Sequence, residues 1–215
     1  MGDEYGSVID KPKSGGLYDY KKIINNITKL IPTYEIGDII ECIDGEFGIN
    51  PFDLKLLKEF IISNNITNVL EFGAGTSTKL LDTLNINRKS YALNSVTHSV
   101  TFHKINLYDD YSLVEKYITD NPTIDMVIID CEHTGKMGAL LNEKFLKLLN
   151  HSRPIFIHDW FDYGKKTYTE QVYYHNNILD KYVVSYMTDL ISPFFDMEKN
   201  HRVPRCSTIL TPILK

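Results

Sequence analysis

The stretch Asn68-Val69-Leu70-Glu71-Phe72-Gly73-Ala74-Gly75-Thr76-Ser77-Thr78 decides the fold. Its first half is an apolar run of the length of a buried strand, and the two glycines permit a tight turn where the backbone approaches a ligand closely. Three leucines then recur at helical spacing, so a helix is expected directly after the turn. The stretch predicts the strand–turn–helix context of a nucleotide-binding glycine loop, with Glu71 at the end of the strand, where open α/β sheets bind ligands.

Strands and helices alternate along most of residues 66–215, which form the predicted core. After the opening strand, further strands are expected at residues 90–94, 101–105, 125–130 and 154–157, and helices at about 109–118, 137–149 and 166–179. This alternation predicts a mostly parallel sheet with right-handed crossovers. Residues 182–186 and 207–211 read as two strands with no helix between them, which indicates an antiparallel pair at the end of the domain.

The N-terminal part of the chain is expected to precede this core as a separate helical layer. Residues 1–16 are rich in glycine and poor in apolar residues, so they are interpreted as a flexible arm. Residues 17–65 form a helical preface, with one helix at 18–31, a short extended segment at 36–43 and a helix that begins at Asn50-Pro51, with Asp53 in its first turn. A chain of 215 residues favours one domain, spanning residues 17–215.

Composition restricts the classes of function. The formal net charge is −5 and the longest basic run is Lys165-Lys166, so an electrostatic nucleic-acid surface is not indicated. No apolar run approaches the roughly 20 residues of a membrane span. Three scattered cysteines suit a reducing compartment, and the acidic, polar N-terminus is not a secretory signal, so we expect the cytoplasm. Association between copies of the chain stays open.

The pattern Glu71-x-Gly73-x-Gly75-x-Ser77 resembles motif I of the class I S-adenosylmethionine-dependent methyltransferases. The resemblance implies an α/β, Rossmann-like fold with a mostly parallel seven-stranded sheet and an antiparallel last strand. It also implies the cofactor S-adenosyl-L-methionine, with contacts from the glycine turn and from the ends of the second, third and fourth strands. The residues expected to bind it are Glu71, Phe72, Gly73, Gly75, Thr76, Ser77, Asn94, Leu107, Tyr108, Asp109 and Asp130.

Two departures from related patterns matter. Ser77 stands where a dinucleotide-binding loop has its third glycine, and Asn94 stands where an acidic residue usually holds the ribose. Both disfavour an NAD-dependent oxidoreductase. An amide at position 94 still accepts and donates hydrogen bonds, but without the strength that a carboxylate charge adds.

Polar side chains follow the fourth and fifth predicted strands. Asp130-Cys131-Glu132-His133 comes after the fourth, and His158-Asp159 comes after the fifth. Because adjacent parallel strands end at the same edge of a sheet, these groups are expected beside the glycine turn. Acids and imidazoles that converge in this way are costly unless they are paired, protonated or bound to a metal.

This arrangement resembles the metal-dependent O-methyltransferases of the macrocin and mycinamicin type, which act on sugar hydroxyls. The resemblance implies that Asp130 and Asp159 bind Mg2+ or Mn2+, with His158 as a softer third ligand, and that His133 is the catalytic base beside Asp130. His133, Trp160 and Tyr163 are expected to face the acceptor. The predicted activity is methylation of a hydroxyl on a small acceptor, with a sugar or glycoconjugate as the expected class.

Other interpretations stay open. One is a nucleic-acid or protein N-methyltransferase of the same fold, although the Asn/Asp-Pro-Pro-Tyr type of loop is absent after the fourth strand. Another is a non-catalytic module that only binds the cofactor. Each site residue also has a plain structural alternative: Asp130 as a loop cap, Asp109 and Asp110 as a helix cap, and Trp160 as part of the core.

Overall fold

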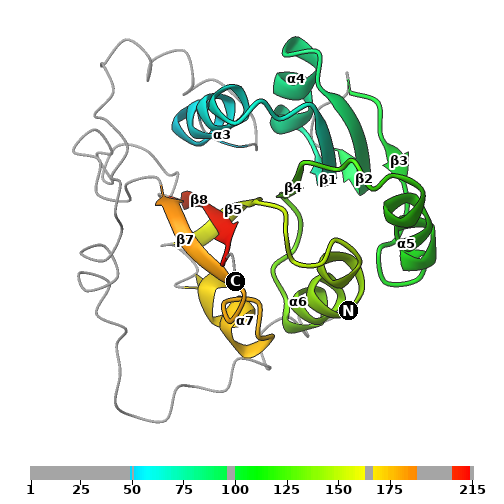
Figure 1. Cartoon of the computed structure of the whole chain (residues 1–215), viewed down its shortest axis with the longest axis vertical. Coiled ribbons are helices and arrows are strands. Elements are labelled where there is room, and N and C mark those ends of the chain that lie inside the picture. The colour runs from blue at the N-terminus through cyan, green and yellow to red at the C-terminus, as the bar shows by residue number, and fades with distance from the viewer. Residues whose placement is uncertain (1–48, 50, 96–99, 163–166, 188–204, 214–215) are drawn as a thin grey trace, which may run out of the picture.

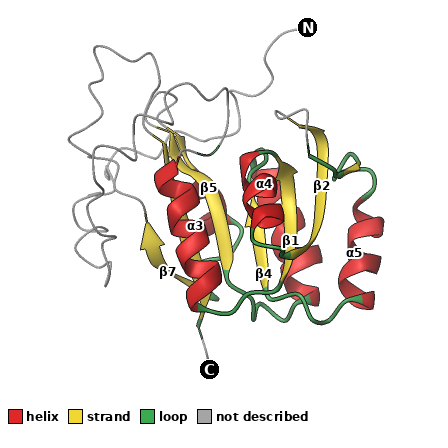
Figure 2. Ribbon diagram, turned by 90° about the horizontal axis from the view of Figure 1, so that it is seen from above, coloured by secondary structure: helices red, strands yellow, loops and turns green. Residues whose placement is uncertain are grey.

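The computed structural model describes residues 49, 51–95, 100–162, 167–187 and 205–213 (Figures 1 and 2). The predicted arm at 1–16, the helix at 18–31, the extended segment at 36–43, Asn50 and Tyr163 lie outside the described residues. Within the described part, no helix is long and apolar enough to cross a membrane.

One mixed sheet forms the centre of the structure, in the strand order β3-β2-β1-β4-β5-β8-β7. The first five strands of this order pair in parallel, and β8 pairs antiparallel with both of its neighbours. The predicted mostly parallel sheet with an antiparallel last strand is therefore confirmed, and the short β6 is an additional strand on β5. The strands are β1 (Asn68–Ala74), β2 (Asn87–Ser95), β3 (His103–Lys104), β4 (Met126–Ile129), β5 (Ile155–Asp162), β6 (Thr167–Tyr168), β7 (Tyr182–Met187) and β8 (Arg205–Pro212).

Helices cover the two faces of this sheet. In Figure 1, α3 (Pro51–Ser63) and α4 (Thr76–Thr83) lie on one side. On the other side lie α5 (Tyr111–Asp120), α6 (Gly135–Leu140) with its π-helical continuation Leu141–Leu146, and α7 (Thr169–His175). Successive strand residues point to opposite faces, so Val69 packs with α3 and α4, whereas Leu70 and Phe72 pack with the opposite layer.

Strand β5 differs most from its prediction. The sequence predicts a strand at 154–157 with His158 and Asp159 beyond its end, but β5 continues to Asp162. Its pairing with β8 shifts register between Ile157 and Phe161, and Asp159 has a φ of 55°. His158 and Asp159 thus lie in a bulge inside the strand. The strand continues beyond the bulge because β8 pairs with it as far as Arg205. The predicted helix at 166–179 is correspondingly shorter and begins after β6.

The glycine turn is locked against the end of β4. The backbone N–H of Asp130 donates to the carbonyl of Phe72 at 2.7 Å. Gly73 has a φ of 97°, and a Cβ at this position would lie 1.9 Å from the carbonyl oxygen of Asp130. Only glycine fits a backbone that is both left-handed and in such close contact. The predicted turn therefore has a steric cause that lies in the neighbouring strand.

Replacing Gly73 with alanine is expected to lower the free energy of unfolding by about 3 kcal/mol, because the new Cβ forces β1 and β4 apart and strains φ. Urea unfolding of the full chain measures this change. Gly135→Ala is the matched control, since a Cβ at Gly135 meets no atom within 4 Å. Equal losses for the two variants would contradict the steric explanation.

Candidate active site

The carboxylate of Glu71 organises the first side of the site. Its side chain is buried, and it accepts hydrogen bonds from the hydroxyls of Ser77 at 2.6 Å, of Thr78 at 2.9 Å and of Ser90 at short range. The Thr78 oxygen also accepts from the N–H of Gly75 at 2.9 Å. Glu71 therefore fastens β1 to α4 and β2 and shapes the glycine turn from inside.

This placement corrects one sequence expectation. Glu71 and Ser77 are predicted to contact a cofactor directly, but both are 0% exposed and bonded to each other. Burial raises the pKa of Glu71, and the hydroxyl hydrogen bonds oppose that rise. Ser90 lies opposite Glu71 in the register of β1 and β2, which a sequence without known register does not reveal. Ser90 and Thr78 are thus supporting residues that sequence analysis missed.

The second side comes from the loops after β3 and β4. The hydroxyl of Tyr108 lies 3.1 Å from the hydroxyl of Thr134, and the ammonium of Lys136 lies 4.1 Å from the centre of the Tyr108 ring. Burial raises the pKa of Tyr108. These contacts join the loop after β3, which carries Tyr108, to the segment after β4, which carries Thr134 and Lys136. Leu107 packs on the core, and Asn94 at the end of β2 is exposed.

The two predicted capping aspartates behave differently from expectation. Asp110 occupies the N-cap position of α5 but makes no side-chain capping bond; its carboxylate accepts from the N–H of Asn106 at 3.2 Å. Asp109 accepts from the Asn106 amide at 2.6 Å. Both acids therefore order the loop that carries Tyr108.

The centre of the site is a cluster around His158. The imidazole is 4% exposed, and its Nδ1 lies 2.8 Å from Oδ1 of Asp130. Its Nε2 lies 3.5 Å from Oδ1 of Asp159 and 3.9 Å from Oδ2 of Asp53. Burial alone lowers the pKa of His158, but the carboxylates outweigh it and raise the pKa to about 9.

Asp53 is the participant that sequence analysis missed. The sequence places it only in the first turn of a helix, yet it is 0% exposed and faces His158. A charged side chain is almost never fully buried without a partner. The helix α3 therefore contributes a functional group to the carboxyl edge of the sheet as well as an apolar face.

His133 lies beside this cluster in the loop after β4. Its Nδ1 is inaccessible to solvent and has no hydrogen-bond partner among the described residues. Burial lowers the pKa of His133 to about 4, against the opposing effect of Asp159 and of a hydrogen bond with the His158 backbone. His133 is therefore neutral at pH 7, whereas His158 is charged. The two imidazoles interact with the same carboxylates, Asp130 and Asp159, but differ in protonation state.

The bulge in β5 explains how neighbouring residues reach one cluster. Adjacent residues of a regular strand point to opposite faces, but the positive φ of Asp159 turns its carboxylate to within 3.5 Å of the His158 ring. The hydroxyl of Thr169, the first residue of α7, donates to the carbonyl of Asp159 at 2.6 Å. The bulge is thus held from outside the strand.

Trp160 does not line an acceptor site. It is 2% exposed and packs edge-to-face on Tyr173, with ring centroids 5.7 Å apart. The prediction that Trp160 faces the acceptor is wrong, because the bulge returns this side chain to the core beneath α7.

The structure does not assemble the implied metal site. No group of three or more histidine, cysteine, aspartate or glutamate side chains among the described residues has an arrangement that holds a metal ion. Asp130, Asp159 and His158 do come together as predicted, but as ion pairs with one another.

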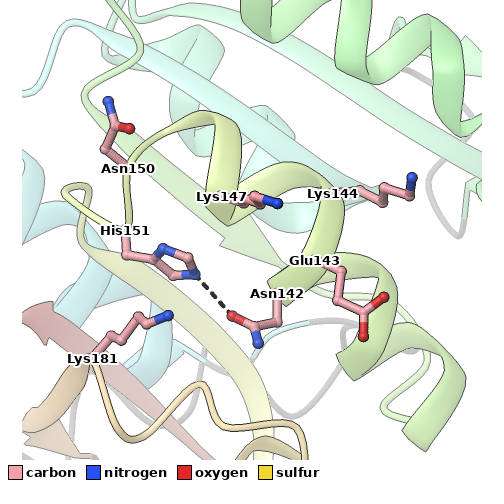
Figure 3. A pocket seen from close by; sticks show the side chains of 7 residues that line it. All are labelled: Asn142, Glu143, Lys144, Lys147, Asn150, His151 and Lys181. Carbon is pink, nitrogen blue, oxygen red and sulfur yellow. Dashed lines mark hydrogen bonds between the residues drawn. The ribbon is translucent and has the colours of Figure 1, made fainter.

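A hollow of about 740 Å3 lies away from this cluster (Figure 3). It is bounded by the π-helical turn and by the segments that precede β5 and β7, so it lies at the opposite edge of the sheet. His151 Nε2 lies 2.8 Å from Asn142 Oδ1 across it. The lining residues are Asn142, Glu143, Lys144, Lys147, Asn150, His151 and Lys181, none of which belongs to the predicted site.

Comparison with known proteins adds little to this geometry. No family model matches the chain, and no curated protein matches it in sequence. Among solved structures, a Staphylococcus aureus protein assigned as a caffeoyl-CoA O-methyltransferase aligns with a TM-score of 0.49 and 14% identity, covering 81% of this chain and 88% of that one. A SAM-dependent methyltransferase from Archaeoglobus fulgidus aligns with a TM-score of 0.41 and 14% identity, covering 74% and 94%. Likenesses at this level carry no argument about activity.

The charged state of His158 predicts a pH-dependent stability. Its pKa is about 9 in the folded protein against about 6.5 unfolded, so its contribution is complete below pH 6.5 and is lost as the pH rises through 9. The difference in unfolding free energy between wild type and His158→Gln should shrink by about 3 kcal/mol over this interval. Denaturant unfolding at several pH values measures it. A pH-independent difference would contradict the ion-pair cluster.

Proposed function

We propose that this protein is an S-adenosylmethionine-dependent methyltransferase that methylates a hydroxyl group of a small acceptor. The observation that carries the proposal is the half-buried, neutral His133 beside Asp130 and Asp159 at the carboxyl edge of the sheet. A neutral imidazole can take a proton from a hydroxyl group, which is the step that an O-methyltransferase has to provide.

The proposed site for the cofactor is the glycine turn after β1. Strand order reverses between β1 and β4, which makes the carboxyl ends of these strands the switch point where open α/β sheets bind ligands. The glycine turn lies there, in contact with Asp130. Backbone groups of Gly73, Gly75 and Thr76 are the candidates for the amino-acid part of the cofactor. Asn94, at the end of β2, and Tyr108, in the loop after β3, are the candidates for its ribose and adenine.

The chemistry that the cofactor supplies is an activated methyl group on a sulfonium. The chain has to orient a hydroxyl in line with that group and to remove its proton. Neutral His133 would accept the hydroxyl proton while the hydroxyl oxygen bonds to the methyl carbon and the carbon–sulfur bond of the donor breaks, leaving the donor as a thioether. Asp130 and Asp159 favour the imidazolium that results, because both carboxylates raise the pKa of His133.

The acceptor class follows from the resemblance given above, which points to a sugar or glycoconjugate. Trp160 is unavailable to stack on it, and His133 is the described residue that would meet its hydroxyl. The implied Mg2+ or Mn2+ does not fit the described ligand set, because Oδ1 of Asp130 is already paired with Nδ1 of His158. No step is therefore assigned to a metal. The proposed setting is the cytoplasm, and self-association stays open.

Calorimetry with S-adenosylhomocysteine should show binding to the full chain, and His133→Ala should keep that binding. Turnover with labelled cofactor on a panel of sugars, glycans, phenols and amines should fall by about 10^2–10^4-fold in this variant, the usual contribution of a general base. His151→Gln, at the opposite edge of the sheet, is the control and should keep full activity. Absence of cofactor binding would refute the proposal, and binding without turnover would favour a non-catalytic module.

The pH profile tests the role of His133 separately. Because the pKa of His133 is about 4, kcat/KM should stay level from pH 8 down to about pH 5, whereas an ordinary histidine base would lose half its activity near pH 6.5. Initial rates at fixed ionic strength measure the profile. An acid limb centred near pH 6.5 would contradict a base whose pKa is lowered in this way.

A further inference from the structure

The side chain of His158 presents both ring nitrogens to carboxylates. Nδ1 lies 2.8 Å from Asp130, and Nε2 lies 3.5 Å from Asp159 and 3.9 Å from Asp53. The three acids come from different parts of the fold: the segment after β4, the bulge of β5 and the first turn of α3. Among the described residues, the neutral His133 also faces the cluster.

This geometry favours one protonation state of the ring. A neutral imidazole has one N–H and one lone pair, and a lone pair held against a carboxylate oxygen is repulsive. Because both nitrogens of His158 face carboxylate oxygens, the form that suits this geometry is the cation, with an N–H on each nitrogen. An imidazolium has no lone pair left with which to bind a metal ion.

The same contacts engage a carboxylate oxygen of Asp130 that could otherwise bind a metal ion. Asp130 is one of the two carboxylates that the resemblance assigns to Mg2+ or Mn2+, and its Oδ1 accepts from His158 at hydrogen-bond distance. Asp159, the other, faces the same ring. The bulge that brings Asp159 and His158 together is anchored by Thr169, so the arrangement is built into the fold.

We infer that the His158 imidazolium occupies this cluster in place of a divalent metal ion, so that the site is metal-independent. The side chain supplies the positive charge that a metal would otherwise supply to Asp53, Asp130 and Asp159. Its consequence for catalysis, methyl transfer that needs no Mg2+ or Mn2+, rests on the proposed function. The state of the cluster itself does not.

The first test is metal binding by the full chain after chelator treatment. Calorimetry with Mn2+ and with Mg2+, each alone at up to about 1 mM, should give no saturable binding at the cluster. Stoichiometric Mn2+ binding to wild type that His158→Ala abolishes would overturn the inference, because His158 would then be a ligand. His151→Gln serves as the matched histidine control, since His151 lies in the hollow at the opposite edge.

The second test exchanges the cation for an anion. His158→Asp removes the positive charge and adds a carboxylate, so this variant should gain saturable Mn2+ binding that wild type lacks. A folded His158→Asp protein, checked by circular dichroism, that binds no Mn2+ would contradict the inference.

A third measurement does not depend on any variant folding. Nitrogen-15 NMR of histidine-labelled wild type at pH 7.5 should show two N–H type ring nitrogens for His158; a lone-pair nitrogen would overturn the inference. These readouts do not involve the methyl donor. If S-adenosylhomocysteine fails to bind while they hold, the proposed function falls and the imidazolium assignment stands. If turnover is observed and a chelator abolishes it, the reverse is true.

Discussion

The contact between Gly73 and the carbonyl of Asp130 is the constraint on which the site depends. It brings the end of β1 against the residue after β4, in a backbone conformation open to glycine alone. Asp130 is held there by its N–H bond to Phe72, and its carboxylate in turn holds His158. The glycine turn and Asp130, to which the proposed function assigns the cofactor and the chemistry, are therefore positioned by one steric contact, with Glu71 supporting the turn from beneath.

The second organising feature is the burial of charge. Asp53 and His158 are almost completely removed from solvent, and such groups persist in a folded protein only when opposite charges meet. Their pairing links α3 to β5 across the face of the sheet. The apolar residues of α3 also pack against Phe156 and Ile209, so the helix that carries Asp53 is held by the core and by the cluster together.

Much of this could be predicted from the sequence because its causes are local. The apolar run before Gly73, the glycines and the alternation of elements gave the sheet and the place of Asp130. What could not be predicted depends on distant partners. The bulge at Asp159 exists because β8 and Thr169 support it, Trp160 is in the core because of that bulge, and Asp53 becomes a site residue only when α3 docks. The metal ligands were inferred from a resemblance to metal-dependent enzymes, and the pairing of His158 with Asp130, which that resemblance did not reveal, leaves Oδ1 of Asp130 engaged by an imidazole.

The position of β8 has a consequence for the order in which the molecule is assembled. This strand lies between β5 and β7 and carries the pairing that sustains the bulge, yet it follows every other described strand in the chain. During synthesis, β1 to β4 emerge first, and β5 has an open edge until β8 leaves the ribosome. The residues around His158 therefore reach their final positions last. A nascent chain can therefore form the glycine turn early, whereas the cluster around His158 is completed only when β8 has paired with β5.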